Sequence, residues 1–388
     1  MNILAMTALN YTKVYTLIED CSGLQKIIAD IKNEPAIGVD LEADSMFHYQ
    51  ERVCLLQISS RENNMVIDPL SVKDLSPLAP VFEDTAVRKI FHGADYDIRS
   101  LFRDFGIEVN NLFDTQIAAK FLGYNETGLA SLLKMKFNIP RDKKYQKRDW
   151  SQRPLPGDML QYAADDTSLL IPLHDILTKE LEEKGFLFCV EEESEILSRV
   201  RPNLSKPGPL FPGFKGAGRL DPRTLAVLEK LLRFRDRMAR QRDCPHFKVL
   251  GNIPILEIAK SKPITKNDLA GITGLNPRLI ERMGSYLINS VKEGLEIPEN
   301  ALPVYPKSPR IRLGHKESAR IKALKILGAR LAQGLGIDPS LVCTNAQIQA
   351  LAIANPKSPE DMKDIPEIRK WQVKLFGEDI CEVLQETG

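Results

Sequence analysis

The chain has 388 residues, with 53 Lys and Arg against 52 Asp and Glu, a formal net charge of +1 and 43% hydrophobic residues. This composition is typical of a globular protein of two or three domains, and it excludes disordered, collagen-like and membrane-spanning chains. The near-zero charge also argues against a strongly basic nucleic-acid-binding protein, unless the average hides domains of opposite sign.

The first half of the chain predicts an α/β domain. Strands are predicted where apolar residues alternate with polar ones or form short runs, at residues 37–41, 53–60, 65–68 and 88–91. Helices are predicted where the apolar residues recur about every 3.6 positions, at residues 95–105, 114–122, 129–137 and 156–184. Strands that cluster early, with helices between and after them, indicate a layered α/β fold.

Two proline-rich stretches and an uneven distribution of charge divide the rest of the chain. Residues 1–200 contain 22 Lys and Arg against 32 Asp and Glu, whereas residues 215–300 contain 16 against 10 and residues 316–388 contain 10 of each. Proline density prevents helix and central strand, so both stretches are predicted to be linkers. The predicted division is a first domain at 1–200, a linker at 201–218, a second domain at 219–297, a linker at 298–315 and a third domain at 316–388.

The two rear segments are predicted to be helical copies of each other. A shift of 93 residues without a gap pairs identical residues along the whole segment, including Asn252 with Asn345, Pro263 with Pro356, Asp268 with Asp361 and Gly284 with Gly377. A constant register over this length favours duplication. The excess of positive charge occurs in the first copy only.

The cysteines, the histidines and the start of the chain bear on location and metal chemistry. The six cysteines and five histidines are scattered without a C-x-x-C pair, which fits a reducing compartment and leaves oxygen ligands for any metal. Met1 to Thr12 lacks the features of a secretory signal, and no apolar run reaches the roughly 18 residues that span a bilayer. We therefore expect a cytoplasmic protein that does not contact a membrane.

Asp40 and Glu42 are the first candidate site residues. They lie two positions apart on a predicted strand, so their side chains share one face while Ile37, Val39 and Leu41 face the core. A solvated strand face is an equally good interpretation of this pair alone. The second candidate is Asp97, in the first turn of a helix that follows a strand ending at Phe91, with Asp95 as the expected N-cap.

Tyr162 and Asp166 complete the set, four residues apart on one face of a predicted helix. Alone, such a pair is more often a local hydrogen bond. Together, however, four carboxylates without histidine or cysteine suit hard divalent cations such as Mg²⁺ or Mn²⁺. Two such ions, roughly 3.5–4 Å apart, can clamp the attacking and leaving oxygens of a phosphodiester. The Tyr162 phenol could orient the attacking water.

These segments resemble the tyrosine-bearing branch of the DEDD superfamily of 3′–5′ exonucleases. VDLEADS resembles the first motif of that family, FHGADYDIRSL the second and YAADD the third. The stretches LLQIS, LFDTQIAAKFLG and RDWSQRPLP are similar to ribonuclease D and its eukaryotic exosome-associated relatives, and the rear segments resemble HRDC domains.

The resemblance implies a fold, a reaction and a set of site residues. The fold would be an α/β RNase H-like exonuclease domain, with a mixed sheet and flanking helices, followed by two all-α HRDC-like domains of which the second is divergent. Two divalent cations, Mg²⁺ or Mn²⁺, would be bound by Asp40, Glu42, Asp97 and Asp166, and Tyr162 would position the water. The reaction would release nucleoside 5′-monophosphates from RNA with a free 3′ end, transfer RNA precursors included, without an obligate protein partner.

Five further residues are predicted to bind RNA. Arg235 and Arg240 belong to the basic run of the second domain, Tyr145 lies in the basic stretch 141–148, and Phe47 and His48 follow the first motif. A solvated helix face and an exposed loop aromatic are the alternative interpretations. Two alternatives for the whole protein also stay open, a DNA exonuclease with the same site and a non-catalytic RNA-binding protein.

Overall fold

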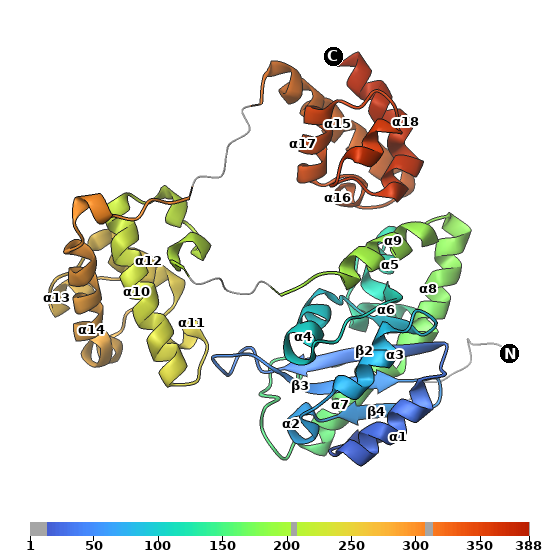
Figure 1. Cartoon of the computed structure of the whole chain (residues 1–388), viewed down its shortest axis with the longest axis horizontal. Helices are drawn as coiled ribbons and strands as arrows, with labels where there is room; N and C mark the ends of the chain where they lie inside the picture. The colour runs from blue at the N-terminus through green and yellow to red at the C-terminus, as the bar shows by residue number, and fades with distance from the viewer. Residues whose placement is uncertain (1–13, 203–207, 307–312, 388) are drawn as a thin grey trace. The chain divides into compact units, whose positions relative to one another are not determined.

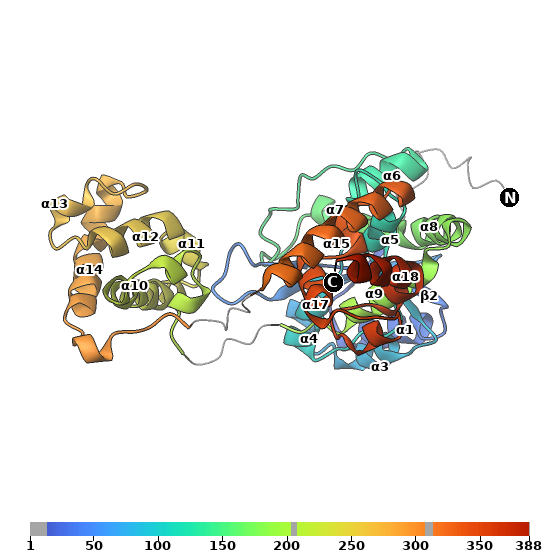
Figure 2. The ribbon, with the colours of Figure 1, turned by 90° about the horizontal axis from the view of Figure 1, so that it is seen from above.

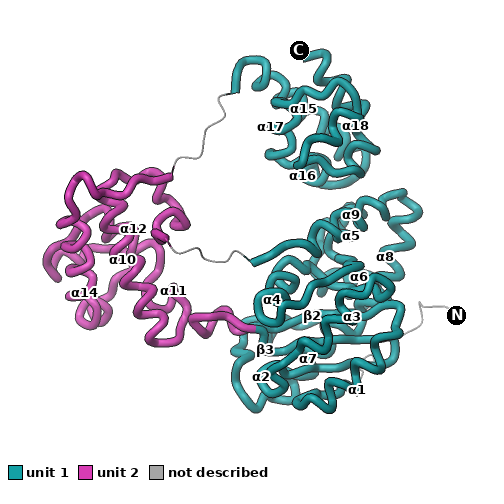
Figure 3. Tube along the Cα trace, viewed as in Figure 1, with its two compact units in different colours: residues 1–43, 53–202, 312–388 teal, residues 44–52, 203–311 magenta. Residues whose placement is uncertain are grey.

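The computed structural model describes residues 14–202, 208–306 and 313–387, so Met1 to Thr12 and part of each predicted linker lie outside the described residues. The chain divides into two compact units (Figure 3). The first unit comprises residues 1–43, 53–202 and 312–388, and the second comprises residues 44–52 and 203–311. Among the described residues, no helix is both long enough and apolar enough to cross a membrane.

A six-stranded mixed sheet forms the centre of the first unit (Figure 1). Its order is β1-β4-β3-β2-β5-β6, with β3 antiparallel to both of its neighbours and the remaining pairs parallel. The strands are β1 (Tyr15–Ile18), β2 (Ala36–Ala43), β3 (Val53–Ser59), β4 (Asn64–Ile67), β5 (Arg88–Phe91) and β6 (Leu112–Asp114). The four strands predicted from the sequence are present, and the predicted mixed sheet with flanking helices is confirmed.

Helices cover both faces of this sheet and extend beyond it. They are α1 (Cys21–Ile31), α2 (Pro69–Val72), α3 (Ala79–Glu83), α4 (Asp95–Phe105), α5 (Thr115–Phe121), α6 (Leu129–Phe137), α7 (Gly157–Ser168), α8 (Leu170–Lys184) and α9 (Leu187–Ser198). One face packs against α1, α3 and α4, and the other packs against α7 through residues such as Leu55, Val66 and Ala163. The two faces of β2 therefore meet different helices, as the alternation of its side chains requires.

The single helix predicted at 156–184 is wrong, because the structure breaks it at Leu169. This residue has φ −112° and ψ 3°, outside the helical region. Just before the break, the Ser59 hydroxyl donates a 2.7 Å hydrogen bond to the carbonyl oxygen of Thr167. The last turn of α7 is thus tied to strand β3, and α8 continues in a new segment.

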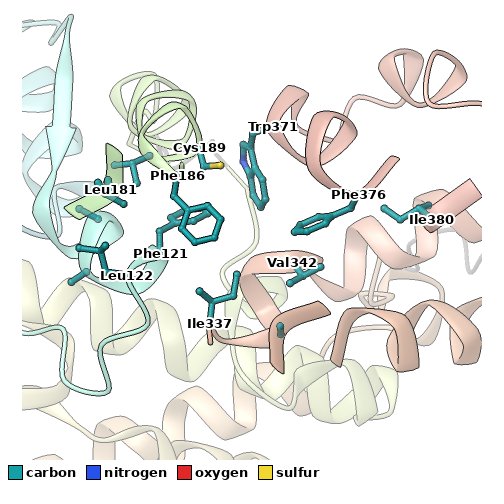
Figure 4. Packing of buried hydrophobic residues seen from close by; sticks show 14 of the residues in the cluster. Phe121, Leu122, Leu181, Phe186, Cys189, Ile337, Val342, Trp371, Phe376 and Ile380 are labelled. Carbon is teal, nitrogen blue, oxygen red and sulfur yellow. The ribbon is translucent and has the colours of Figure 1, made fainter. Parts of the chain in front are cut away.

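The C-terminal helices of the first unit are α15 (His315–Leu335), α16 (Pro339–Val342), α17 (Asn345–Ala354) and α18 (Lys370–Glu386). Figure 4 shows Trp371 beside Phe121 and Phe186 within one buried cluster. The Trp371 ring meets that of Phe121 edge to face at 5.2 Å, and its Nε1 donates a 2.8 Å hydrogen bond to Glu193. Glu192 accepts the backbone N–H groups that open α18, where the helix dipole favours a carboxylate.

The second unit is a helical domain with its own core. Its helices are α10 (Pro222–Gln241), α11 (His246–Val249), α12 (Asn252–Ser261), α13 (Lys266–Leu269) and α14 (Pro277–Leu295). Figure 1 and Figure 2 both show α12 and α14 beside the long helix α10. The predicted 93-residue register recurs in the structure, since α12 and α17 end at the left-handed residues Lys262 and Asn355.

Candidate active site

Asp40 and Glu42 project from the face of β2 that α7 and α8 cover. The opposite face is core, because Val39 and Leu41 are buried. Asp40 and Glu42 both line a pocket of about 390 Å³. The strand therefore presents two carboxylates to one cavity while its apolar residues anchor it to the sheet, as the alternating pattern predicts.

Gly38, two residues before Asp40, allows α7 to approach β2. A Cβ atom at this position would lie 2.7 Å from the Ser59 hydroxyl oxygen and 3.0 Å from the Thr167 carbonyl oxygen. Both distances are shorter than ordinary van der Waals contact. The absent side chain thus lets the C-terminal turn of α7, which carries Asp166, lie against the strand that carries Asp40.

Asp97 lies in the first turn of α4, 7% exposed. The predicted N-cap at Asp95 is wrong, because Asp95 is already inside the helix and pairs with Arg99 at 2.9 Å. The carboxylate of Asp114 instead accepts the N–H groups of Gly93 and Ala94, at 3.0 and 2.8 Å. Asp114 thereby holds the turn between β5 and α4 that delivers Asp97.

Tyr162 and Asp166 share one face of α7 and line the same pocket as Asp40 and Glu42. Their spacing of four residues places them one turn apart. The Tyr162 ring meets that of Tyr145 edge to face at 5.5 Å. The third predicted motif and the first are therefore brought to one cavity.

Burial raises the pKa values of the four carboxyl groups, and the charges of neighbouring acids raise them further. Burial is the largest cause for each of them, and it raises the pKa of Asp40 to about 8 and that of Asp166 to about 6. The pKa of Glu42 also lies well above its usual range, because burial is reinforced by the charges of Asp40, Asp166 and Asp97. Burial and the charge of Asp40 likewise raise the pKa of Asp97. The four groups thus form one electrostatically coupled set of acids.

Such a set has the chemistry of a site for hard divalent cations. Crowded carboxylates favour their charged form only when a cation neutralises them. Within the part of the chain that the structure describes, no three His, Cys, Asp or Glu side chains already have the geometry of a metal site. Asp166 instead accepts a 2.6 Å hydrogen bond from the guanidinium group of Arg141.

Seven polar residues of the pocket were not singled out from the sequence. They are His92, Gln116, Ser131, Arg141, Asp142, Lys143 and Gln146. Arg141 and Lys143 belong to the basic stretch 141–148, so the positive charge of this stretch was the sequence signal that could have indicated them. The charge pattern does not say which basic residue of the stretch contacts the carboxylates. His92 follows β5 directly and donates or accepts a 2.9 Å hydrogen bond at Thr115. Its position at a strand end was the available signal.

The five residues predicted to bind RNA lie in three places. Tyr145 packs beside Tyr162, with the Lys144 ammonium group 4.8 Å from its ring centre. Phe47 and His48 belong to the second unit, where the Phe47 ring lies 4.4 Å from the Lys248 ammonium group. Neither of them is among the residues that line the pocket of Asp40.

His48, Arg235 and Arg240 make polar contacts within the second unit. His48 Nδ1 lies 2.7 Å from Asp243. Arg235 is half-buried and donates to the Leu250 carbonyl oxygen and the Asn252 side chain. Arg240 is exposed, with its guanidinium group 5.2 Å from the ring centre of Tyr49. RNA binding by these residues stays a prediction.

Sequence comparisons match both parts of the chain to known families. A family model described as 3′–5′ exonuclease matches residues 15–182, and an HRDC domain model matches residues 224–291 and 317–384. The two HRDC matches begin 93 residues apart, which confirms the predicted duplication. Ribonuclease D of Pseudomonas paraeruginosa is 29% identical over 95% of this chain and 97% of its own length. Ribonuclease D of Escherichia coli K12 is 29% identical over 96% of this chain and 99% of its own length.

Solved structures show the same similarity. The crystal structure of Escherichia coli RNase D, described as an exoribonuclease involved in structured RNA processing, matches with a TM-score of 0.73 and 28% identity. The match covers 96% of this chain and 99% of that one. The catalytic core of RRP6 from Trypanosoma brucei matches with a TM-score of 0.63 and 31% identity, over 76% of this chain and 83% of that one.

Proposed function

The chain belongs to the ribonuclease D family of 3′–5′ exoribonucleases, and we propose that it removes nucleotides from RNA with Asp40, Glu42, Asp97, Asp166 and Tyr162. The observation that carries this assignment is the convergence of the first and third motifs on one pocket of about 390 Å³, with Asp97 coupled to it electrostatically. The reaction is hydrolysis of the 3′-terminal phosphodiester, with release of nucleoside 5′-monophosphates.

The four carboxylates would hold two divalent cations, Mg²⁺ or Mn²⁺. The donor set supports this, because it contains oxygen ligands only and its acids repel one another without a counter-charge. Bound there, the ions would supply charge neutralisation at the attacking and leaving oxygens. Asp166 would exchange its hydrogen bond with Arg141 for the cation.

Tyr162 would orient the attacking water with its phenol group. Burial and the charge of Asp166 raise the pKa of Tyr162 above its usual value, so the phenol stays neutral at physiological pH. A neutral phenol can both donate and accept a hydrogen bond. It can therefore hold a water molecule without adding a further negative charge to the carboxylates.

Structured RNA with a free 3′ end is the proposed substrate, with transfer RNA precursors as the specific class. The relatives that carry the name ribonuclease D, and a solved relative described as acting in structured RNA processing, support this class. The positive excess of residues 215–300, with 16 Lys and Arg against 10 Asp and Glu, supports a role of the second unit in holding the phosphate backbone.

The proposal is tested with purified variants on an RNA that carries extra 3′ nucleotides. Asp166→Asn should abolish digestion, and Tyr162→Phe should lower kcat by about 100-fold or more while RNA affinity is kept. Asp95→Asn is the matched control, because Asp95 lies in the second motif but forms an exposed pair with Arg99. Turnover of Asp166→Asn at the wild-type rate would overturn the assignment of the site. A normal kcat of Tyr162→Phe would show that Tyr162 does not orient the attacking water.

A further inference from the structure

Arg141 is a residue of the active-site pocket for which the proposed chemistry has no role. It lies in the segment between α6 and α7, and its side chain is 14% exposed. One terminal nitrogen donates a 2.6 Å hydrogen bond to Oδ1 of Asp166, and the other donates a 3.0 Å hydrogen bond to Oδ2 of Asp165. The guanidinium carbon lies 5.7 Å from the ring centre of Tyr162.

The Arg141 guanidinium group acts as a positive counter-charge to Asp166, one of the four carboxylates. Of the ion pairs formed between described residues, the one that reaches a proposed metal ligand is Arg141 with Asp166. Asp166 Oδ1 cannot accept a short hydrogen bond from Arg141 and coordinate a cation along the same direction. Arg141 and a divalent cation are therefore competitors for one carboxylate oxygen.

The hydrogen bond of Arg141 with Asp165 determines where the guanidinium group would lie once a cation has displaced it from Asp166. Asp165 is not among the proposed metal ligands, and Gln161 holds its other oxygen through a 2.8 Å hydrogen bond. Displacement from Asp166 would thus leave one end of the guanidinium group anchored at the edge of the pocket. The freed end would face the cavity in which the RNA terminus is cleaved, and a guanidinium group binds phosphate oxygens in a planar, two-pronged geometry.

We propose that Arg141 is a positioning residue that holds Asp166 in the metal-free enzyme and binds a phosphate of the RNA terminus once divalent cations occupy the carboxylates. This inference rests on the proposed function of the site. A purely structural ion pair would keep Arg141 on Asp166 throughout, whereas the proposed role gives Arg141 one partner before cations bind and another afterwards. Removal of its side chain should then affect cation binding and RNA binding in opposite directions.

The first test measures Mn²⁺ binding to the full chain by titration calorimetry without RNA. Arg141→Gln should bind Mn²⁺ about tenfold more tightly than the wild type, since a charge-assisted hydrogen bond no longer competes. Arg141→Lys, which cannot bridge Asp165 and Asp166, should show a smaller gain in the same direction. Lys147→Gln is the matched control, since Lys147 is an exposed basic residue of the same segment, and it should leave Mn²⁺ affinity unchanged.

The second test measures RNA digestion at saturating Mn²⁺, where the difference in cation affinity no longer matters. Arg141→Gln should raise KM for a short RNA about tenfold and change kcat less, and Arg141→Lys should recover part of the loss. Lys147→Gln should change KM less than twofold. Circular dichroism of each variant checks folding, and the lysine variant provides the test if the glutamine variant does not fold.

The outcomes separate this inference from the proposed function. Loss of Mn²⁺ binding in Asp166→Asn, together with unchanged or weaker binding in Arg141→Gln, would overturn the role of Arg141 and leave the metal site standing. Unchanged Mn²⁺ binding in Asp166→Asn would overturn the metal site itself. A KM of Arg141→Gln equal to that of Lys147→Gln would refute the phosphate contact.

Discussion

The crowding of carboxylates predicts that Asp40→Asn stabilises the metal-free protein although it abolishes activity. The folded-state pKa of Asp40 is raised from the usual 3.8 to about 8, first by burial and then by the charge of Asp166. Each unit by which the pKa is raised corresponds to about 1.4 kcal/mol, so the raised pKa of Asp40 lowers the free energy of unfolding at pH 8 by at most about 6 kcal/mol. Because Asp166 shares the repulsion and asparagine is also polar, we expect a gain of about 2 kcal/mol.

The sign of the pH dependence follows from the raised pKa. The folded chain keeps the Asp40 proton over a pH range in which the unfolded chain has lost it, so wild-type stability falls as pH rises from about 4 to about 8. Asp40→Asn lacks this contribution. Its advantage should therefore be largest at pH 8 and should vanish near pH 4.

Thermal unfolding in a chelator measures the effect. A gain of about 2 kcal/mol corresponds to a rise in Tm of about 4–8 °C for a domain of this size. Asp95→Asn serves as the control, and its Tm should change little because its pair with Arg99 is exposed. Addition of Mg²⁺ should raise the wild-type Tm and reduce the difference. An Asp40→Asn protein that is no more stable than the wild type at pH 8 would refute the reasoning.

Three further predictions concern the packing of the site, the binding of RNA and the packing of α18 against the first domain. Gly38→Ala should weaken Mn²⁺ binding and lower the free energy of unfolding by about 1–3 kcal/mol, because the added Cβ would push α7 away from β2. Gly157→Ala is the control, since a Cβ at that position meets open space and should change neither Mn²⁺ affinity nor stability. Exchange of the exposed Arg237 and Arg242 for glutamine should weaken RNA binding. RNA affinity should also fall less steeply with salt, and the slope of log affinity against log salt should become less negative by about 0.7 for each phosphate that is no longer neutralised. Equal slopes for variant and wild type would show that neither residue binds phosphate. Trp371→Ala should lower the free energy of unfolding by about 3–5 kcal/mol in calorimetry, because the ring is buried against Phe121, and an unchanged Tm would contradict that packing.

The parts of the fold that follow local rules were predictable from the sequence. The alternation around Asp40 and Glu42 predicted both the strand and the shared face, because side-chain direction in a strand depends on parity alone. The spacing of Tyr162 and Asp166 predicted a common helix face for the same reason. The constant shift of 93 residues predicted the duplicated helical domain, since a repeat needs no knowledge of packing.

The parts that depend on residues distant in sequence were not predictable. The break at Leu169 lies beside the hydrogen bond between Ser59 and Thr167, which joins residues 108 positions apart. The turn before α4 is held by the carboxylate of Asp114, a residue distant in sequence, whereas local capping rules favour Asp95, which lies inside the helix. The hydrogen bond of Arg141 with Asp166 is of the same kind, because several basic residues of one stretch are equivalent until the tertiary structure selects one.

The central claim is that the carboxylate pocket digests RNA from its 3′ end with divalent cations. The most direct test is a time course on matched 5′-labelled RNA and DNA strands, with Mg²⁺ or Mn²⁺ and with a chelated control, in which both products and rates are recorded. The account predicts stepwise shortening of RNA from the 3′ end, release of nucleoside 5′-monophosphates, slower digestion of DNA and no reaction in the chelator. Internal cleavage, undiminished hydrolysis in the chelator, or tight RNA binding without hydrolysis in either metal would contradict it.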